Sequence, residues 1–180
     1  MASDDRGKPT AATRQAPDRW DRADFETVRL SPNVFPDISP DVVVDLNGRG
    51  CTIPQVWYHV EPANVVHGRF TDPGRMDLAV LCSVERVSSI LVYRGSSTGD
   101  VAVLNPVPDR NYLQDVGGHI GFSRAIHAVD PEFIRYHHAA LGGPEPPPLD
   151  HDGVNDAFVG KASRVWYWHD GKWLRLQGAD

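Results

Sequence analysis

The end of the chain constrains the fold most, because it is typical of a β-hairpin with a defined turn. Asp170-Gly171 is a favoured two-residue hairpin turn, and it separates two runs with alternating apolar residues, 163–169 and 172–177. Pairing His169 with Lys172 places four apolar side chains on one face, which we expect to point to the core. They are Val165, Tyr167, Leu174 and Leu176.

Further apolar or alternating runs precede the hairpin, at 64–70, 76–83, 88–94, 100–104 and 119–126. Segments rich in turn residues separate them. Together with the hairpin they predict an α+β fold that is mainly an antiparallel β-meander of about six or seven strands.

Two short helices are expected as well. Ser39-Pro40-Asp41 supplies an N-cap, a first-turn proline and an early acid, and the helix would end at Gly48 or Gly50. The valines at 42–44 favour a strand as the alternative, but we expect the helix. A capping aspartate and a proline open the second helix, over 131–141, and two glycines end it.

Residues 1–22 are polar and contain two prolines, so they predict a disordered leader. The remainder, 23–180, is long enough for a single domain with a sizeable core.

Charge and hydropathy exclude some classes of partner. A formal net charge of -6 and scattered arginines argue against nucleic acid, which needs a concentrated basic surface. No apolar run approaches the roughly 18 residues that cross a bilayer. The absence of a signal peptide predicts a cytoplasmic protein, and the alternative is an exported one with its leader missing and a Cys51–Cys82 disulfide.

The run 150–156 places three carboxylates around Gly153, which is how a short loop surrounds a hard cation. Calcium is the expected ion. Its ligands would be the Asp150, Asp152 and Asp156 carboxylates and the Val154 carbonyl. An EF-hand is excluded, because that register puts a proline first and a valine twelfth. The alternative is a turn in which the aspartates bond their own backbone amides.

The same acids, followed by Phe158-Val159, resemble the loops of FG-GAP or VCBS-type repeats, in which D-x-D-G-x-x-D leads directly into a strand. The run 68–80 looks like a degenerate copy that keeps Gly74 and Asp77. The resemblance implies calcium loops and propeller blades, but only locally, since a multi-blade propeller does not fit this length. From Arg49 to the end, the chain also resembles a group of uncharacterised bacterial proteins.

A second candidate site lies on the other face of the hairpin, where aromatic and cationic side chains interleave. They are Arg164, Trp166, Trp168, Trp173 and Arg175. The tryptophans could stack on a sugar or a partner side chain while the arginines bond its polar groups. The alternative is that a second layer, such as the 131–141 helix, covers the indoles and leaves the arginines at the rim.

A non-enzymatic binding or structural module with one calcium-binding loop is therefore the expected function, with an unknown protein or carbohydrate as partner. The alternative is a small hydrolase that uses Ser123 or a metal at the acidic loop. The run around Ser123 reads as continuous strand, which disfavours a nucleophile elbow. His137 and His138 are adjacent on the expected helix and cannot chelate zinc together.

Overall fold

The computed structural model describes residues 16–180, in which the chain forms three α-helices and twelve strands. The helices are α1 (Arg19–Glu26), α2 (Pro40–Gly48) and α3 (Pro131–Leu141), and three 3-10 turns are η1 (Pro32–Val34), η2 (Arg94–Ser96) and η3 (Asp109–Tyr112). The strands are β1 (Arg29–Leu30), β2 (Ile53–Pro54), β3 (Val65–Gly68), β4 (Asp77–Val84), β5 (Val87–Tyr93), β6 (Val101–Pro108), β7 (Leu113–Asp115), β8 (Ile120–Phe122), β9 (Arg124–Val129), β10 (Gly153–Phe158), β11 (Ala162–His169) and β12 (Lys172–Gln177).

Two four-stranded antiparallel meanders make up most of the fold, β3-β4-β5-β6 and β9-β10-β11-β12. We call them the first and the second sheet. Two short pairs, β1-β2 and β7-β8, complete the strands. The expected antiparallel meander is confirmed, but the count of six or seven strands is too low. Strands of two or three residues carry no alternation for a sequence pattern to detect, and the expected strand at 119–126 is interrupted at Ser123.

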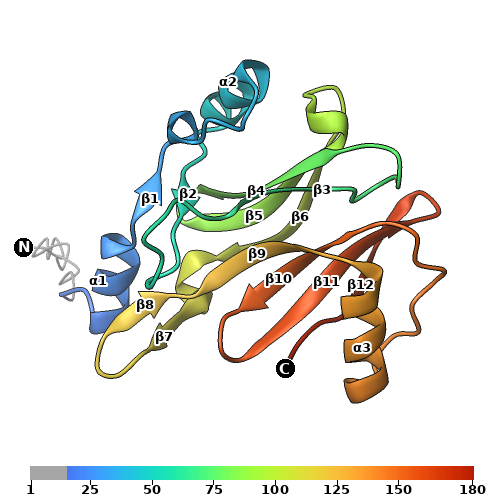
Figure 1. Ribbon diagram of the computed structural model, residues 1–180. Helices are drawn as coiled ribbons and strands as arrows, with labels where there is room; N and C mark the ends of the chain where they lie inside the picture. The colour runs from blue at the N-terminus through green and yellow to red at the C-terminus, as the bar shows by residue number, and fades with distance from the viewer. Residues whose placement is uncertain (1–15) are drawn as a thin grey trace, which may run out of the picture.

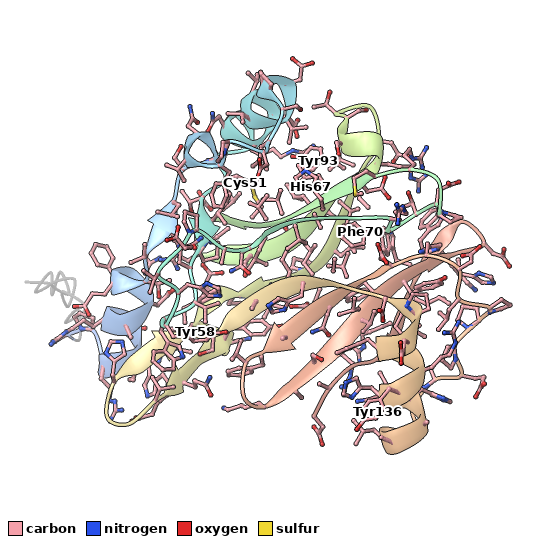
Figure 2. The ribbon with its side chains drawn as sticks, in the orientation of Figure 1. Cys51, Tyr58, His67, Phe70, Tyr93 and Tyr136 are labelled. Carbon is pink, nitrogen blue, oxygen red and sulfur yellow. A yellow bond between two sulfur atoms is a disulfide. The ribbon has the colours of Figure 1, made fainter. Side chains whose placement is uncertain are left out.

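The two sheets pack face to face, and a helix covers the outer face of each (Figure 1). Val42 and Leu46 of α2 are fully buried against the first sheet. Ile134 of α3 is fully buried against the second sheet, with Val165 and Tyr167 of β11. The inner core between the sheets includes Phe70, which Figure 2 shows between the two layers.

The central strand β4 shows why this arrangement suits the sequence. Leu78, Val80 and Cys82 face α2, whereas Ala79 and Leu81 face the second sheet. A strand buried on both faces needs a continuous apolar run rather than an alternating one. The run of five apolar residues at 78–82 therefore requires a layer on each side.

The hairpin and the two expected helices are confirmed. His169 pairs with Lys172, and positive φ angles at Asp170 and Gly171 form the turn. The Asp130 side chain caps α3 by accepting a hydrogen bond from the Phe133 amide. The expected helix after Ser39 forms as α2, although the Ser39 side chain makes no capping bond.

The expected leader 1–22 is wrong over its last residues, because α1 begins at Arg19; residues 1–15 lie outside the described part of the chain. Asp18 and Asp21 form a capping box that starts this helix. Trp20 and Ala23 then pack against the inner core. The sequence pattern does not reveal the start of α1, because this helix has only these few apolar positions.

Cys51 and Cys82 form a disulfide that ties the segment after α2 to the central strand β4. Figure 2 places Cys51 on the α2 side of the first sheet. A disulfide fits the exported alternative better than the expected cytoplasmic location, because such bonds persist in oxidising compartments. Within residues 16–180, none of the helices is long and apolar enough to cross a bilayer.

Candidate functional site

A buried ion pair within the second sheet makes further hydrogen bonds to the first. Arg124 of β9 and Asp156 of β10 form two parallel hydrogen bonds of 2.9 Å, and both side chains are almost completely buried. Arg124 also donates to the backbone and hydroxyl oxygens of Ser88 on β5 and to the carbonyl of Asn105 on β6. These five bonds satisfy every N–H of the guanidinium. Arg124 therefore connects the second sheet to two strands of the first.

A β-bulge in β6 brings Asn105 to this ion pair. The register with β5 shifts between Ser88 and Ile90, where β6 carries an extra residue, and Asn105 adopts a left-handed backbone with φ of 47°. Its side-chain amide donates to the Asp156 carboxylate at 2.8 Å. Bulges of this kind re-aim a side chain, and they recur beside functional sites.

A pocket of about 390 Å³ opens beside this ion pair, between the two sheets. We call it the inter-sheet pocket. Strands of both sheets and η3 line it, with aromatic, amide and cationic side chains. The lining residues that matter below are Asn105, Asn111, Tyr112, Asp156, Phe158, Arg164, Trp166 and Arg175. This volume lies within the usual range for small-molecule sites.

Two cations in this lining form no ion pair, because Asp156, the acid of the lining, which lies across the sheet from Arg164, is held by Arg124 and Asn105. Arg164 and Arg175 form no ion pair with any acid in residues 16–180, and the one side-chain bond that Arg164 makes is to the Ser163 carbonyl. Trp166 separates them: it shares a strand with Arg164 and pairs directly with Arg175 across the sheet. The Nε1 of Trp166 is shielded from solvent and has no acceptor in this part of the chain. The pocket therefore offers unused donors on either side of an indole.

Tyr112 adds an aromatic wall whose electrostatics follow from the ion pair. Its ring lies 4.7 Å from the Arg124 guanidinium carbon, which is cation–π geometry. Burial, together with the negative charge of Asp156, raises the pKa of the Tyr112 hydroxyl. Tyr112 is therefore neutral at physiological pH and can donate a hydrogen bond.

Three members of the expected Trp/Arg face, Arg164, Trp166 and Arg175, meet at this pocket, and two lie elsewhere. Trp168 and Trp173 contact each other edge to face at 5.6 Å, and the Arg94 guanidinium stacks over Trp168 at 4.4 Å. A second layer lies over part of this face, where Trp166 and Trp173 pack against the inner core. That layer is the first sheet, and not the 131–141 helix, which packs on the opposite face.

The expected calcium ligands do not come together. Asp156 lies within β10 and is held by Arg124, whereas the Asp152 carboxylate accepts the Arg69 amide and Asp150 accepts the Tyr167 hydroxyl. The strand starts at Gly153, so Asp152 and Asp156 lie about 13 Å apart along it. Val154 is fully buried in the inner core. Within 16–180, no three His, Cys, Asp or Glu side chains group as a metal site. Calcium at Asp150 and Asp152 stays a prediction.

In the run 68–80, which was expected to resemble a degenerate copy of this loop, the acid is also held by hydrogen bonds within the fold. Asp77 opens β4, the second strand of the first sheet, and Asp156 lies in β10, the second strand of the second sheet. Asp77 is fully buried and accepts hydrogen bonds from the Thr71 amide, the Thr71 hydroxyl and the Gly95 amide. Each acid thus serves as an internal acceptor that organises neighbouring backbone or side chains.

The residues of the hydrolase alternative are dispersed. Ser123 is fully buried between β8 and β9, and its hydroxyl donates to the Gly121 carbonyl at 3.1 Å. No histidine of the described part bonds to it. His137 stacks against Phe133 on α3, and His138 lies 3.5 Å from Glu145. A fully buried hydroxyl in this arrangement does not reach a substrate.

The sequence-based interpretation missed the partnership of Arg124 with Asp156, although a signal for it exists. Asp156 alternates with Val154 and Phe158, and a strand places such residues on one face. That alternation indicates an inward carboxylate, which needs a buried cation rather than a solvated ion.

Comparisons of the chain with protein-family models, with curated proteins and with solved structures found no match.

Proposed function

We propose that the chain is a binding module and that the inter-sheet pocket holds a small anionic ligand with a flat, weakly polar face. An acidic sugar is the class that fits best. The observation that carries the proposal is the pair of uncompensated arginines, Arg164 and Arg175, on either side of Trp166.

The contrast with the arginines that form ion pairs supports this interpretation. Arg29 and Arg124, the well-buried arginines of the fold, are both paired with aspartates, and so are several exposed ones. Arg164 and Arg175 form no ion pair within 16–180, as is also true of Arg22, Arg69 and Arg135, and they differ from those three because they line the inter-sheet pocket together. A guanidinium binds carboxylate or phosphate in a bidentate manner, and such charge-assisted bonds are about twice as strong as neutral ones.

The aromatic and amide residues narrow the ligand class. Trp166 and Tyr112 offer ring surfaces of the kind that stack on the apolar face of a sugar, and the amides of Asn105 and Asn111 can pair with hydroxyl groups. The Asn105 amide nitrogen is already bonded to Asp156, so Asn111 is the freer of the two. A flat anion without hydroxyl groups would use only part of this lining.

The two meanders also support the local resemblance to blade-forming repeats, because a propeller blade is a four-stranded antiparallel sheet. Here α2 and α3 cover the outer faces, where further blades would pack. We therefore propose a closed two-sheet module that shares the loop pattern without the circular assembly.

Isothermal titration with four compounds tests the ligand class. Glucuronate and glucose 6-phosphate should bind with similar affinity, and neutral glucose and inorganic phosphate should bind at least tenfold more weakly. Arg175→Gln should weaken glucuronate binding at least about tenfold, which corresponds to about 1.4 kcal/mol. Arg22→Gln is the matched control, because Arg22 is exposed on α1 and does not line the pocket.

The outcomes separate the parts of the proposal. Equal affinity for phosphate and for the acidic sugars would reduce the site to an anion site and remove the sugar class. No saturable binding of either acidic sugar, or unchanged affinity in Arg175→Gln, would contradict the proposed function.

A further inference from the structure

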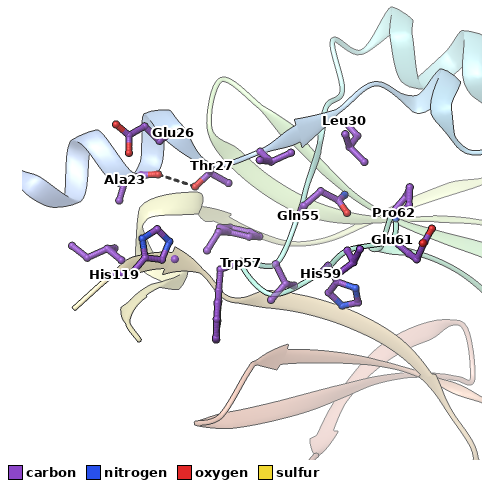
Figure 3. Close-up of a pocket in the computed structure, with 16 residues that line it drawn as sticks. Ala23, Glu26, Thr27, Leu30, Gln55, Trp57, His59, Glu61, Pro62 and His119 are labelled. Carbon is purple, nitrogen blue, oxygen red and sulfur yellow. Dashed lines mark hydrogen bonds between the residues drawn. The ribbon is translucent and has the colours of Figure 1, made fainter. Parts of the chain in front are cut away.

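A second concavity, larger than the inter-sheet pocket, lies between α1, the segment 55–62 and β8 (Figure 3). Its volume is about 510 Å³, and it shares no residue with the inter-sheet pocket. We call it the α1 groove. Its floor is apolar, with Leu30, Val56, Ile120 and Phe122 among the lining residues.

The wall of the α1 groove exposes large apolar side chains to solvent. Val60 is 94% exposed and Trp57 is 47% exposed, although both line the groove. Val28, which also lines the groove, is exposed as well, and the ring of Tyr58 lies edge to face with that of Trp57. Contiguous exposed apolar side chains around a concavity are characteristic of a protein interaction site.

The backbone holds this wall in place. The Trp57 amide donates to the Phe122 carbonyl, and the Gln55 side chain bonds the Ala63 amide and carbonyl, so both ends of the segment are anchored. Gly121 passes directly beneath Trp57: a Cβ there would lie 2.5 Å from the Trp57 Cβ. The exposed aromatic residues therefore project from a segment whose two ends are held by hydrogen bonds.

Apart from the imidazoles of His59 and His119, the ionisable side chains that line the groove are acids. Glu26 lies on the α1 side and Glu61 on the opposite side of the view in Figure 3, with Trp57 between them. Neither carboxylate forms an ion pair with a cation of residues 16–180. No lysine or arginine of that range lines the groove. An apolar floor between two uncompensated acids complements a segment that carries both cationic and aliphatic side chains.

We propose that the α1 groove docks a segment of a partner protein in which arginine or lysine side chains alternate with aliphatic ones. The aliphatic side chains fill the floor at Val56 and Phe122, and the cations reach Glu26 and Glu61. Apolar burial supplies the affinity, and the two acids select against acidic segments.

Peptide probes test this proposal with the full chain. The first is an acetylated and amidated octapeptide that alternates arginine with leucine. The second replaces each arginine with glutamate, and the third replaces each leucine with serine. Amide shifts in two-dimensional NMR, followed during titration, give both the affinity and the location. Binding of the first peptide should saturate below about 1 mM and shift the backbone amide signals of 55–61 and 119–122, and the other two peptides should bind at least tenfold more weakly.

Variants locate the binding surface. Val60→Ser and Glu61→Gln should each weaken binding of the arginine-leucine peptide at least about threefold. The first removes apolar contact area and the second removes a counter-charge. Val103→Ser is the matched control, since Val103 is exposed on β6 and away from the groove. Unfolding midpoints of the variants show whether each remains folded.

The proposal is overturned if the glutamate-leucine peptide binds as tightly as the arginine-leucine one, or if no peptide saturates up to about 1 mM. Shifts confined to other surfaces would also overturn it. Sedimentation measures the oligomeric state and tests whether a second copy of this chain occupies the groove. A dimer that Val60→Ser dissociates would assign the groove to that second copy instead of to a partner protein.

Discussion

Removing the Asp156 carboxylate tests whether its ion pair with Arg124 holds the sheets together. Asp156→Ala leaves Arg124 fully buried, without a counter-charge and with two N–H groups that have lost their acceptor. Breaking a buried pair from one side costs about 3–5 kcal/mol, because an uncompensated charge stays in the interior. The exposed pair of Arg94 with Asp100 should contribute about 1 kcal/mol at most.

Urea unfolding near neutral pH, followed by circular dichroism and tryptophan fluorescence, measures how much each substitution lowers the free energy of unfolding. With a slope of about 2 kcal/mol per molar urea, the midpoint of Asp156→Ala should fall by about 1.5–2.5 M. Asp100→Ala, the matched control, should shift it by less than about 0.5 M. The double variant Arg124→Met with Asp156→Leu should recover much of the loss, because it removes both charges and restores apolar volume.

If Asp156→Ala lowers the free energy of unfolding by less than about 1 kcal/mol, this reasoning is refuted. So would a double variant no more stable than the single one. Either result would mean that the guanidinium finds water or another acceptor between the sheets.

Three further predictions follow from particular contacts. Reduction, or Cys51→Ser with Cys82→Ser, should lower the free energy of unfolding by about 3.5–4 kcal/mol, because the bond closes a loop with a sequence separation of 31; an unchanged midpoint under reducing conditions would contradict this. The Arg49 guanidinium holds the pKa of Asp45 below its ordinary value of 3.8, against partial burial and with help from the Tyr93 hydroxyl. This stabilisation is present above the ordinary pKa and is lost as the pH falls through the folded value, so Asp45→Asn should reduce the drop in melting temperature between about pH 5 and pH 3. Calcium at a hundred times a dissociation constant would add about 2.7 kcal/mol. The predicted calcium loop therefore requires a calcium-specific rise in melting temperature that Asp152→Ala abolishes, and the absence of such a rise would contradict it and agree with Arg124 holding Asp156.

Local chemistry made the hairpin and the helices predictable. The Asp170-Gly171 turn and the Asp130 cap are each specified within a few residues, and the structure contains both. The division into two sheets depends instead on contacts between distant segments. No pattern within 64–70 or 119–126 indicates that these runs belong to different sheets.

The candidate site shows the same limit. The sequence placed Trp166, Arg164 and Arg175 on one face, because a strand alternates with period two. It could not show that β6 and η3 would close a pocket over them, since Asn105 and Tyr112 come from more than fifty positions earlier in the chain. Asp156 was assigned to calcium because its neutralising partner, Arg124, lies 32 positions away.

A crystal structure of the chain with glucuronate bound tests the central claim most directly. The proposed function predicts the carboxylate between Arg164 and Arg175, with the sugar ring over Trp166 and a hydroxyl within reach of Asn111. Glucuronate bound on another surface, or an inter-sheet pocket without ligand density at a saturating concentration, would contradict it.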